Sequence, residues 1–238
     1  MSNWYYICEF LNLVVKTKDL DMELKRIKMV QDIKELFKIY LCIKEEIIKR
    51  LLEFELLFKR KETHKILLEL IFCLLTPQSK AKVCWRCVED MDKNRVLFSG
   101  DVDNIKSYLK GVRFKNKKAF YIVEATKRFN EILDVIYSDK SVFEKRVWLV
   151  KNIKGIGCKE ASHFLRNIGL GKDLSILDRH ILKNLKFYKV IDSVPKSLSF
   201  RKYIEIEEKM RHFSHSIEIP LDHLDLLLWY KETKEIFK

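Results

Sequence analysis

Residues that interrupt helices are scarce in this chain, which has only six Gly and three Pro among its 238 residues. Because Gly and Pro mark turns, their scarcity argues against a fold made of many short strands. Long stretches rich in Leu, Ile, Glu and Lys instead repeat their apolar residues at spacings of three and four, as amphipathic helices do. The sequence therefore predicts an all-α fold with few or no strands.

The cysteines do not form the compact, regular framework of a small secreted domain. Six occur, at positions 8, 42, 73, 84, 87 and 158, and no cleavable signal peptide is recognisable before them. We therefore expect an intracellular, cytoplasmic protein with reduced thiols. Cys84 and Cys87 form a lone CxxC. Without a second ligand pair, these sulfurs fit a partly buried helix better than a metal site, so the sequence predicts no metal and no cofactor.

A long apolar run is also missing from the N-terminus. Residues 3–15 are rich in aromatic and aliphatic side chains, but Glu9 and Asn12 interrupt them and the segment is too short for a membrane span. Residues 1–28 form an extension to the main domain at 29–238. Either Met29 is the true initiator, or the extension is an amphipathic helix packed on the body. The intact mass of the natively expressed protein distinguishes these two hypotheses.

Positive charge is abundant. The chain has 47 Lys and Arg against 34 Asp and Glu, a formal charge of +13. Such an excess favours partners with negative potential, such as nucleic acid or an anionic membrane surface, and predicts salt-sensitive association.

The most informative motif is residues 154–159, with the sequence KGIGCK, followed by Asp178. Apolar residues before and after the motif fit two short helices joined by a glycine hairpin, which is a helix-hairpin-helix. Gly155, Ile156 and Gly157 would let a phosphate approach the main chain and the N-terminus of the second helix. A tight interhelical turn explains the glycines equally well when they are considered alone.

Lys159 and Asp178 carry the candidate chemistry. A lysine in the first turn of a helix opposes the helix dipole, so stability alone would not favour it there. The same positive field favours the neutral amine, which is the nucleophilic form. Asp178 precedes a helix-like segment and fits an N-cap. One carboxylate can serve both as a cap and in catalysis.

These residues resemble a known family. A Gly-hydrophobic-Gly-X-Lys hairpin, with an Asp just under twenty residues later, is similar to the helix-hairpin-helix DNA glycosylases, the superfamily of endonuclease III and 8-oxoguanine DNA glycosylase. Residues 154–167 and 178–182 resemble its type 2 8-oxoguanine glycosylases, found mostly in archaea. Residues 75–79, 111–122 and 224–230 resemble further family blocks in the family's order, and the resemblance extends from about residue 29 to the end.

The resemblance implies two α-helical subdomains that flank a DNA-binding cleft. The hairpin would form one wall, and the two ends of the chain would combine in the other. It implies a base-excision repair enzyme that flips 8-oxoguanine out of double-stranded DNA and excises it. The C-terminal region lacks the four cysteines that hold the iron–sulfur cluster of the endonuclease III branch. Lys159 would form a Schiff base with the sugar and nick the abasic site by β-elimination, while Asp178 would stabilise positive charge. We expect a monomer without an obligate protein partner.

Recognition of the base requires an acceptor for the N7 proton that distinguishes 8-oxoguanine from guanine. The resemblance suggests that the chain terminus serves here, where the side chain or α-carboxylate of Lys238 could reach the base. Without the resemblance, a terminal lysine would be predicted to be frayed and solvated. Phe114 and Trp229 are candidates to stack on the flipped purine, although either could be ordinary core.

Two further residues are candidates for contacts to the base or to the gap that it leaves. Asp225 lies four residues before Trp229 on the same helical face and could accept hydrogen bonds from purine N–H groups; the alternative is a surface ion pair. Gln78 resembles the residue that fills the space of the extruded nucleotide, and a helix-capping turn explains it almost as well. His163 and His180 are predicted to be structural.

The coarse pattern predicts ten helices, with boundaries uncertain by about two to four residues. They are expected at 30–56, 63–76, 79–92, 101–109, 115–130, 141–152, 159–168, 178–187, 199–212 and 221–235.

Two other functions fit part of the sequence. A non-catalytic helix-hairpin-helix DNA-binding module explains the charge and the glycines, but leaves the pair Lys159 and Asp178 unexplained. A glycosylase for another lesion, such as thymine glycol or an adenine mismatch, explains the pair equally well. The terminal lysine and the missing cluster cysteines favour 8-oxoguanine.

Overall fold

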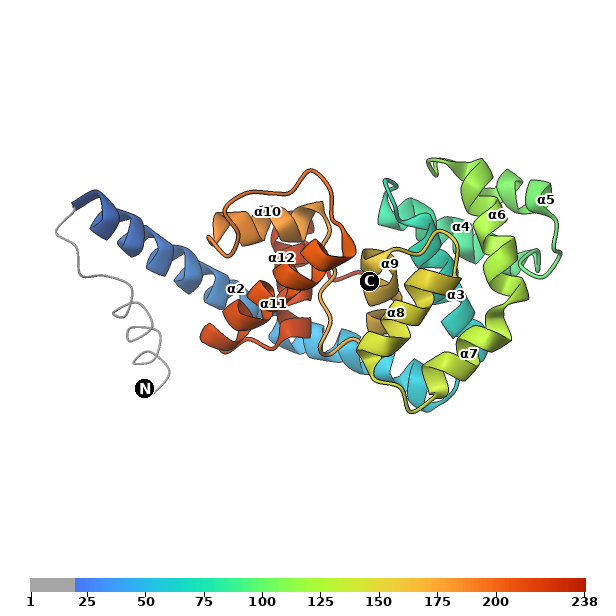
Figure 1. Cartoon of the computed structure of the whole chain (residues 1–238), viewed down its shortest axis with the longest axis horizontal. Coiled ribbons are helices and arrows are strands. Elements are labelled where there is room, and N and C mark those ends of the chain that lie inside the picture. Colours follow the sequence, from blue (N-terminus) through green and yellow to red (C-terminus); the bar gives the residue numbers. More distant parts are fainter. Residues whose placement is uncertain (1–19) are drawn as a thin grey trace. The chain divides into compact units, whose positions relative to one another are not determined.

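The computed structural model describes residues 20–238, with side chains from Ile27 onward, and this part of the chain contains eleven α-helices and no strand (Figure 1). The predicted all-α fold is confirmed. The helices are α2 (Leu20–Lys59), α3 (Thr63–Leu75), α4 (Ala81–Lys93), α5 (Val102–Tyr108), α6 (Lys115–Lys127), α7 (Phe129–Tyr137), α8 (Val142–Asn152), α9 (Cys158–Asn167), α10 (Arg179–Phe187), α11 (Phe200–Ser216) and α12 (Leu221–Thr233).

The chain divides into two compact units. Unit 1 contains Met1–Arg50, described from Leu20 onward, together with Leu177–Lys238. Unit 2 contains Leu51–Ile176. Residues 20–50 and 177–238 therefore fold into the same unit, as the family resemblance implies for the two ends of the domain, and the hairpin lies in the other.

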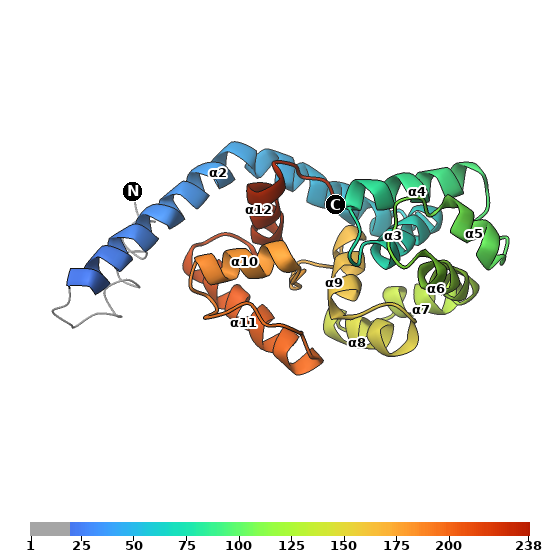
Figure 2. The same ribbon diagram turned by 90° about the horizontal axis from the view of Figure 1, so that it is seen from above.

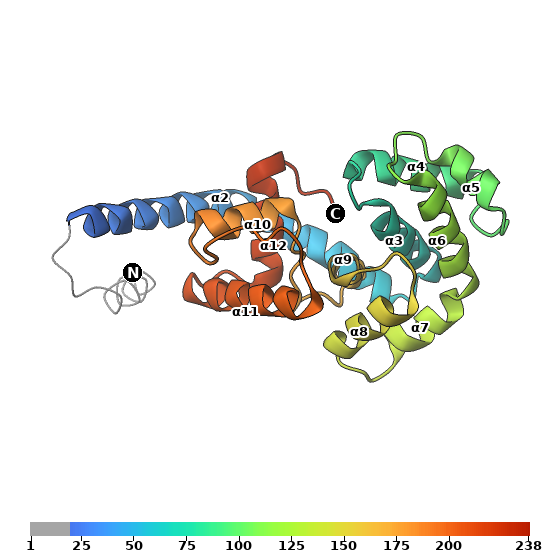
Figure 3. The same cartoon turned by 45° about the horizontal axis from the view of Figure 1, so that its top comes forward.

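Unit 2 is built around α3, which packs against α4, α6 and α9 (Figure 3). From Ile66 onward all of its residues except Glu69 are apolar, which is typical of a helix enclosed by others, and every residue from Ile66 to Leu75 is buried. One of them is charged: the Glu69 carboxylate accepts a 2.8 Å hydrogen bond from the Asn167 amide of α9. The most apolar helix of the unit thus supports the helix that follows the hairpin.

Unit 1 combines α10, α11 and α12 with the first part of α2. Helix α12 packs against both α10 and α11, and its Leu224 and its run Leu226, Leu227 and Leu228 are buried. Helix α2 meets α12 through Tyr40, whose hydroxyl lies 2.9 Å from His223 Nδ1 (Figure 2). These contacts hold the N-terminal helix against the C-terminal one.

Most predicted helices are found within a few residues of their expected bounds, with three clear differences. Helix α2 begins at Leu20 and passes through Met29 without a break, and α11 extends to Ser216. Residues 1–19 lie outside the described residues, so both hypotheses about the extension stay predictions. The predicted helix 115–130 ends at Lys127, and a separate helix, α7, follows it.

Helix α7 was not predicted, although its sequence contains a signal for it. Phe129, Ile132 and Ile136 are its buried residues, at the i, i+3 and i+7 spacing of an amphipathic helix. Arg128 separates α6 from α7 with φ −98° and ψ 14°, which is outside helical geometry. The break therefore lies at an arginine, a residue type that does not predict the end of a helix.

None of the helices that the structure describes in residues 20–238 is both long and apolar enough to cross a membrane.

Candidate active site

The predicted helix-hairpin-helix consists of α8, a turn at residues 153–157, and α9. Helix α8 starts with a capping box, in which Ser141 and Glu144 each bind the other's backbone N–H. Such reciprocal bonds satisfy two donors that a helix N-terminus otherwise leaves open. Ile156 at the tip of the turn is 5% exposed. The apolar residue of the Gly-Ile-Gly sequence therefore anchors the turn in unit 2.

Gly155 is required by the geometry of the turn. Its φ is +86°, in the region that L side chains rarely adopt. A Cβ at this position would lie 2.4 Å from Cδ2 of Tyr121. The turn thus depends on glycine for its backbone angles and for the close approach of an aromatic ring.

Helix α9 has an open N-terminus. Its N-cap is Gly157, which has no side chain to accept hydrogen bonds from the first-turn N–H groups. Glu160 stabilises this end from the other direction, because its Oε2 accepts a 3.1 Å bond from the Gly157 N–H. A helix end of this kind presents backbone donors and a positive dipole end, which suit a phosphate.

Lys159 lies in the first turn of α9, as predicted. Its side chain is 23% exposed, and Nζ lies 3.0 Å from Glu160 Oε1. Glu160 therefore contacts both the hairpin and the candidate amine. The sequence reasoning missed Glu160, although a glutamate three residues after an N-cap is a recognised capping signal.

Basic and aromatic side chains surround the hairpin. The Lys154 ammonium lies 3.7 Å from Glu124 and 5.2 Å from the ring centre of Phe120. Arg128 donates a hydrogen bond to the Asn152 carbonyl at the C-terminus of α8. Lys154 keeps 63% of its side chain exposed, so a positive charge lies beside the glycines on the surface of unit 2.

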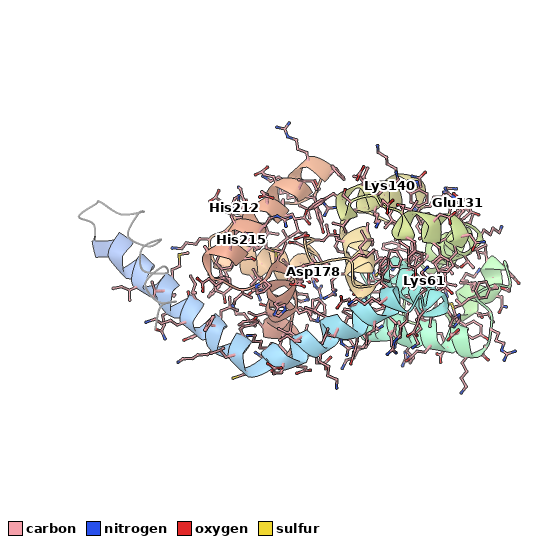
Figure 4. All side chains as sticks on the ribbon, turned by 90° about the horizontal axis from the view of Figure 1, so that it is seen from below. Lys61, Glu131, Lys140, Asp178, His212 and His215 are labelled. Carbon is pink, nitrogen blue, oxygen red and sulfur yellow. The ribbon has the colours of Figure 1, made fainter. Side chains whose placement is uncertain are left out.

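Asp178 is the N-cap of α10 (Figure 4). Its Oδ1 accepts hydrogen bonds of 2.8 Å from the N–H groups of both His180 and Ile181. The predicted capping role is confirmed. Oδ2 makes no hydrogen bond to any residue in the part of the chain that the structure describes. One oxygen of the carboxylate thus holds the helix, and the other is available for a second function.

Trp229 lies on α12 and packs edge-to-face on His180, with ring centres 5.1 Å apart. His180 Nδ1 lies 3.9 Å from Glu232, and Lys183 donates a 2.8 Å hydrogen bond to the same carboxylate. The hydrogen bond from Lys183 is the main cause that lowers the pKa of Glu232. This cluster connects the helix that Asp178 caps with the helix that carries Trp229.

The other C-terminal candidates are not ordinary surface residues. Asp225 is 4% exposed, so the alternative of a surface ion pair is wrong. Lys238 is half-buried and Ile236 near it is buried, so the prediction of a frayed, solvated terminus does not hold either.

Gln78 and Phe114 belong to unit 2 and share an unusual backbone. Both adopt left-handed φ values, 55° and 58°, and both are exposed, Phe114 by 54%. Phe114 is therefore not ordinary core. Gln78 lies in the turn between Thr76, the C-cap of α3, and Lys80, the N-cap of α4, which agrees with the alternative of a helix-capping turn.

The CxxC cysteines lie on α4 and are buried, as predicted. The Cys84 thiol donates to the Leu75 carbonyl at 3.2 Å, and Cys87 to that of Lys110 at 3.6 Å. Burial is the main cause that raises the pKa of Cys84 to about 11. Among the described residues, no group of three or more His, Cys, Asp or Glu could hold a metal ion. His163 is also buried, with its ring edge-to-face on Phe72.

The predicted site residues thus divide between the units. Unit 2 contains the hairpin glycines, Lys159, Gln78 and Phe114, whereas unit 1 contains the candidates Asp178, Asp225, Trp229 and Lys238.

Comparison with known proteins gives the family. Residues 47–219 match the family described as Ogg-HhH, 8-oxoguanine DNA glycosylase. The 8-oxoguanine DNA glycosylase/AP lyase of Fusobacterium nucleatum is 46% identical over 209 residues, covering 86% of this chain and 96% of the relative. This chain belongs to the 8-oxoguanine DNA glycosylase family. A relative of the same name from Methanocaldococcus jannaschii is 41% identical over 196 residues, 82% of this chain and 93% of its own.

Solved structures of the 8-oxoguanine DNA glycosylase family have the same fold. The crystal structure of the M. jannaschii enzyme matches with a TM-score of 0.79 at 38% identity, covering 88% of this chain and 97% of that one. A structure of the M. jannaschii glycosylase/lyase in complex with a 15mer DNA containing 8-oxoguanine gives a TM-score of 0.80 at 38% identity, over 87% and 100% of the two chains. The predicted helix-hairpin-helix glycosylase fold is confirmed.

Proposed function

We propose that this protein excises 8-oxoguanine from double-stranded DNA and then cleaves the strand at the abasic site. The observation that carries the proposal is Lys159, an amine in the first turn of α9 directly after the Gly155–Gly157 hairpin turn. Helix stability does not favour a lysine at this position, whereas a lysine here supplies an amine nucleophile beside the proposed phosphate site. The relatives named 8-oxoguanine DNA glycosylase/AP lyase match over nearly their whole length, which supports the same pair of activities here.

DNA binding would begin at the hairpin. The backbone around Gly155, Ile156 and Gly157 and the open end of α9 are proposed to hold a phosphate next to the damaged nucleotide. Because a base inside the duplex is stacked and paired, the nucleotide must rotate out before its glycosidic bond can be cut. The charge of +13 favours binding to the polyanion.

The chemistry uses the neutral Lys159 amine as the nucleophile. Its lone pair forms a bond to the sugar C1′ as the bond from C1′ to N9 of the base breaks, and the base leaves with the bonding electrons and takes up a proton. Opening of the sugar ring gives a Schiff base between Nζ and C1′. Removal of a C2′ proton then allows β-elimination, in which the 3′ phosphate leaves and the strand is nicked.

Asp178 is proposed to stabilise the positive charge that develops on the sugar, through the carboxylate oxygen that does not cap α10. A carboxylate held rigidly by two backbone N–H groups is preorganised for this role. It needs no rearrangement when the charge appears.

The remaining candidates are proposed to read the base. Phe114 and Trp229 would stack on the flipped purine, and Asp225 would accept hydrogen bonds from its N–H groups. The α-carboxylate of Lys238 would accept a hydrogen bond from the N7–H that guanine lacks, whereas its ammonium group could only donate. Gln78 would fill the space that the nucleotide leaves.

Borohydride trapping on a duplex that contains 8-oxoguanine tests the proposal. Reduction of the Schiff base should join the protein to DNA irreversibly, and Lys159→Gln should abolish the adduct while DNA affinity stays within about twofold, since the site keeps its other phosphate contacts. Lys172→Gln, which changes an exposed lysine of the same unit, should trap like the wild type. An adduct in the Lys159 variant would identify another amine as the nucleophile.

A panel of duplexes with thymine glycol, mismatched adenine or 8-oxoguanine tests the lesion. We expect the fastest excision for 8-oxoguanine. A C-terminal tag should reduce discrimination between 8-oxoguanine and guanine, because it removes the free α-carboxylate of Lys238. Equal discrimination by tagged and untagged protein would contradict the role of the terminus, and the absence of any wild-type adduct would contradict catalysis and leave a DNA-binding module.

A further inference from the structure

We propose that Lys118 is a positioning residue that holds Gln78 and Phe114 in place for extrusion of the damaged nucleotide. This inference deepens the proposed function and rests on it. Lys118 lies in α6, is only 4% exposed and binds the turn that carries Gln78. We use the name Lys118 clamp for Lys118 together with Leu75, Pro77, Ser79 and Arg113.

The Lys118 ammonium uses all three of its hydrogen-bond donors within unit 2. It donates to the carbonyls of Leu75 and Pro77, both at 2.7 Å, and to the Ser79 hydroxyl at 3.1 Å. An ammonium group has three N–H bonds and accepts none, so its capacity is filled. The C-terminal end of α3, where Leu75 lies, carries partial negative charge that favours a cation.

Ser79 joins this turn to the loop before α6. Its Oγ accepts from Lys118 Nζ and also from the Arg113 N–H at 3.0 Å. A hydroxyl oxygen has two acceptor positions, and both are used here. The Arg113 N–H belongs to the residue directly before Phe114, so one buried charge connects the two segments that present Gln78 and Phe114.

Both presented residues need such support. A residue other than glycine with a left-handed φ costs roughly 1–3 kcal/mol and persists only where the surroundings determine it. Gln78 and Phe114 both adopt this backbone with exposed side chains. Their own side chains therefore contribute little to holding the strained turns, and the Lys118 clamp supplies fixed hydrogen bonds beside each one.

Burial makes the lysine a costly choice for a simple structural contact. Burial is the main cause that lowers the pKa of Lys118 below its ordinary value. An apolar side chain of similar length could fill the same volume at no such cost. An apolar side chain could not form charge-assisted hydrogen bonds to three acceptors at once. These three bonds fix the two turns relative to each other.

The test compares a substrate from which a base must be extruded and removed with one that already lacks the base. Lys118→Met should slow excision of 8-oxoguanine from a duplex by about tenfold to a hundredfold, the scale expected when contact residues are misplaced by about 1 Å. Cleavage of a preformed abasic site, and its borohydride adduct, should stay within about twofold, since no base has to be removed. Lys127→Met, which removes an exposed lysine from the same helix, should leave both activities unchanged.

Ser79 gives a second and milder pair of variants. Ser79→Ala should lower the ratio of excision to abasic-site cleavage by a few-fold, and Ser79→Thr, which keeps the hydroxyl, should restore it. If Lys118→Met does not fold, the two Ser79 variants test whether the Lys118 clamp positions Gln78 and Phe114. A 2-aminopurine placed next to the lesion reports extrusion directly, and its fluorescence rise on binding should weaken in Lys118→Met and Ser79→Ala.

The inference is overturned if the folded Lys118→Met and Ser79→Ala variants keep the wild-type ratio, or if both activities fall together as in a general loss of stability. Failure of the proposed function has a different signature, because the wild-type protein itself would then form no adduct on either substrate.

Discussion

The N-termini of α9 and α10 differ in whether a side chain accepts hydrogen bonds from their first-turn N–H groups. Helix α10 starts with Asp178, whose carboxylate accepts two backbone hydrogen bonds, whereas α9 starts with Gly157, which has no side chain to offer. A cationic lysine follows in the first turn of α9. Helix α10 thus begins with charge that stabilises its dipole, and α9 begins with charge that opposes it.

This contrast identifies the helix end that is available for a ligand. At α10 the Asp178 carboxylate occupies two first-turn donors and places a negative charge at the helix end, which disfavours a phosphate there. An N-terminus that is left open retains donors and a positive field. The stability that α9 gives up at Gly157 and Lys159 is partly restored by Glu160, which binds the Gly157 N–H from within the helix.

Substitutions of Asp178 should cause the greatest loss of activity and separate its two roles. Asp178→Ser keeps a capping side chain but loses the charge, so excision should fall by roughly 10²–10³-fold, as for loss of a preorganised electrostatic group, with little change in stability. Asp178→Ala should lose the same activity and also about 1 kcal/mol of stability. Single-turnover excision and urea unfolding measure the two effects. Wild-type excision by the Ser variant would show that Asp178 is only a cap.

Substitution of Gly155 should disrupt the hairpin turn that precedes the N-terminus of α9. Gly155→Ala places a Cβ against Tyr121 at a left-handed φ, which should cost about 3 kcal/mol of stability and weaken DNA binding. Gly100→Ala is the matched control, because Gly100 also has a positive φ but open space around it; it should cost about 1 kcal/mol. Equal unfolding midpoints for the two variants would mean that the turn tolerates a side chain.

Glu160 tests how far α9 depends on its internal cap. Glu160→Ala removes the acceptor for the Gly157 N–H and should lower the free energy of unfolding by about 1 kcal/mol. Glu160→Gln keeps an acceptor while it removes the charge beside Lys159, so its loss should be smaller. Urea midpoints at constant slope give both values. If the two variants lost the same stability, the charge beside Lys159 would be the dominant contribution.

A small loss of stability at acidic pH should arise in unit 1, at His223. Burial is the main cause that lowers the pKa of His223, the nearby Lys44 acts in the same direction, and Asp222 opposes them. As the pH falls below about 6.5, the unfolded chain takes up a proton before the folded one does, so stability is present above this pH and lost below it.

A comparison of melting temperatures at pH 7.5 and 5.5 measures this effect. His223→Gln should reduce the drop in melting temperature, whereas His212→Gln, at an exposed position on α11, should not (Figure 4). An unchanged drop in the His223 variant would assign the acid response to other groups.

Much of the fold was predictable because its signals are local. Apolar spacing located most helices, and the glycines at 155 and 157 marked the hairpin. Helix α7 was missed because the break at Arg128 depends on backbone angles that its residue type does not reveal. Glu160 and Lys118 were missed as site residues for different reasons: Glu160 carries a local capping signal, whereas the partners of Lys118 lie 39 to 43 residues away in the chain. One local signal for Lys118 existed, since it falls on the same buried face of α6 as Ile122.

The sequence alone determined the helical class, the hairpin, the positions of Lys159 and Asp178 at helix starts, and the family resemblance, because each depends on residues that are neighbours along the chain. Tertiary structure decided that Asp225 is buried, that Phe114 is exposed on a left-handed backbone, and that one lysine connects two distant turns. Burial and long-range hydrogen bonds depend on which helices pack together, and no local pattern of residues contains that information.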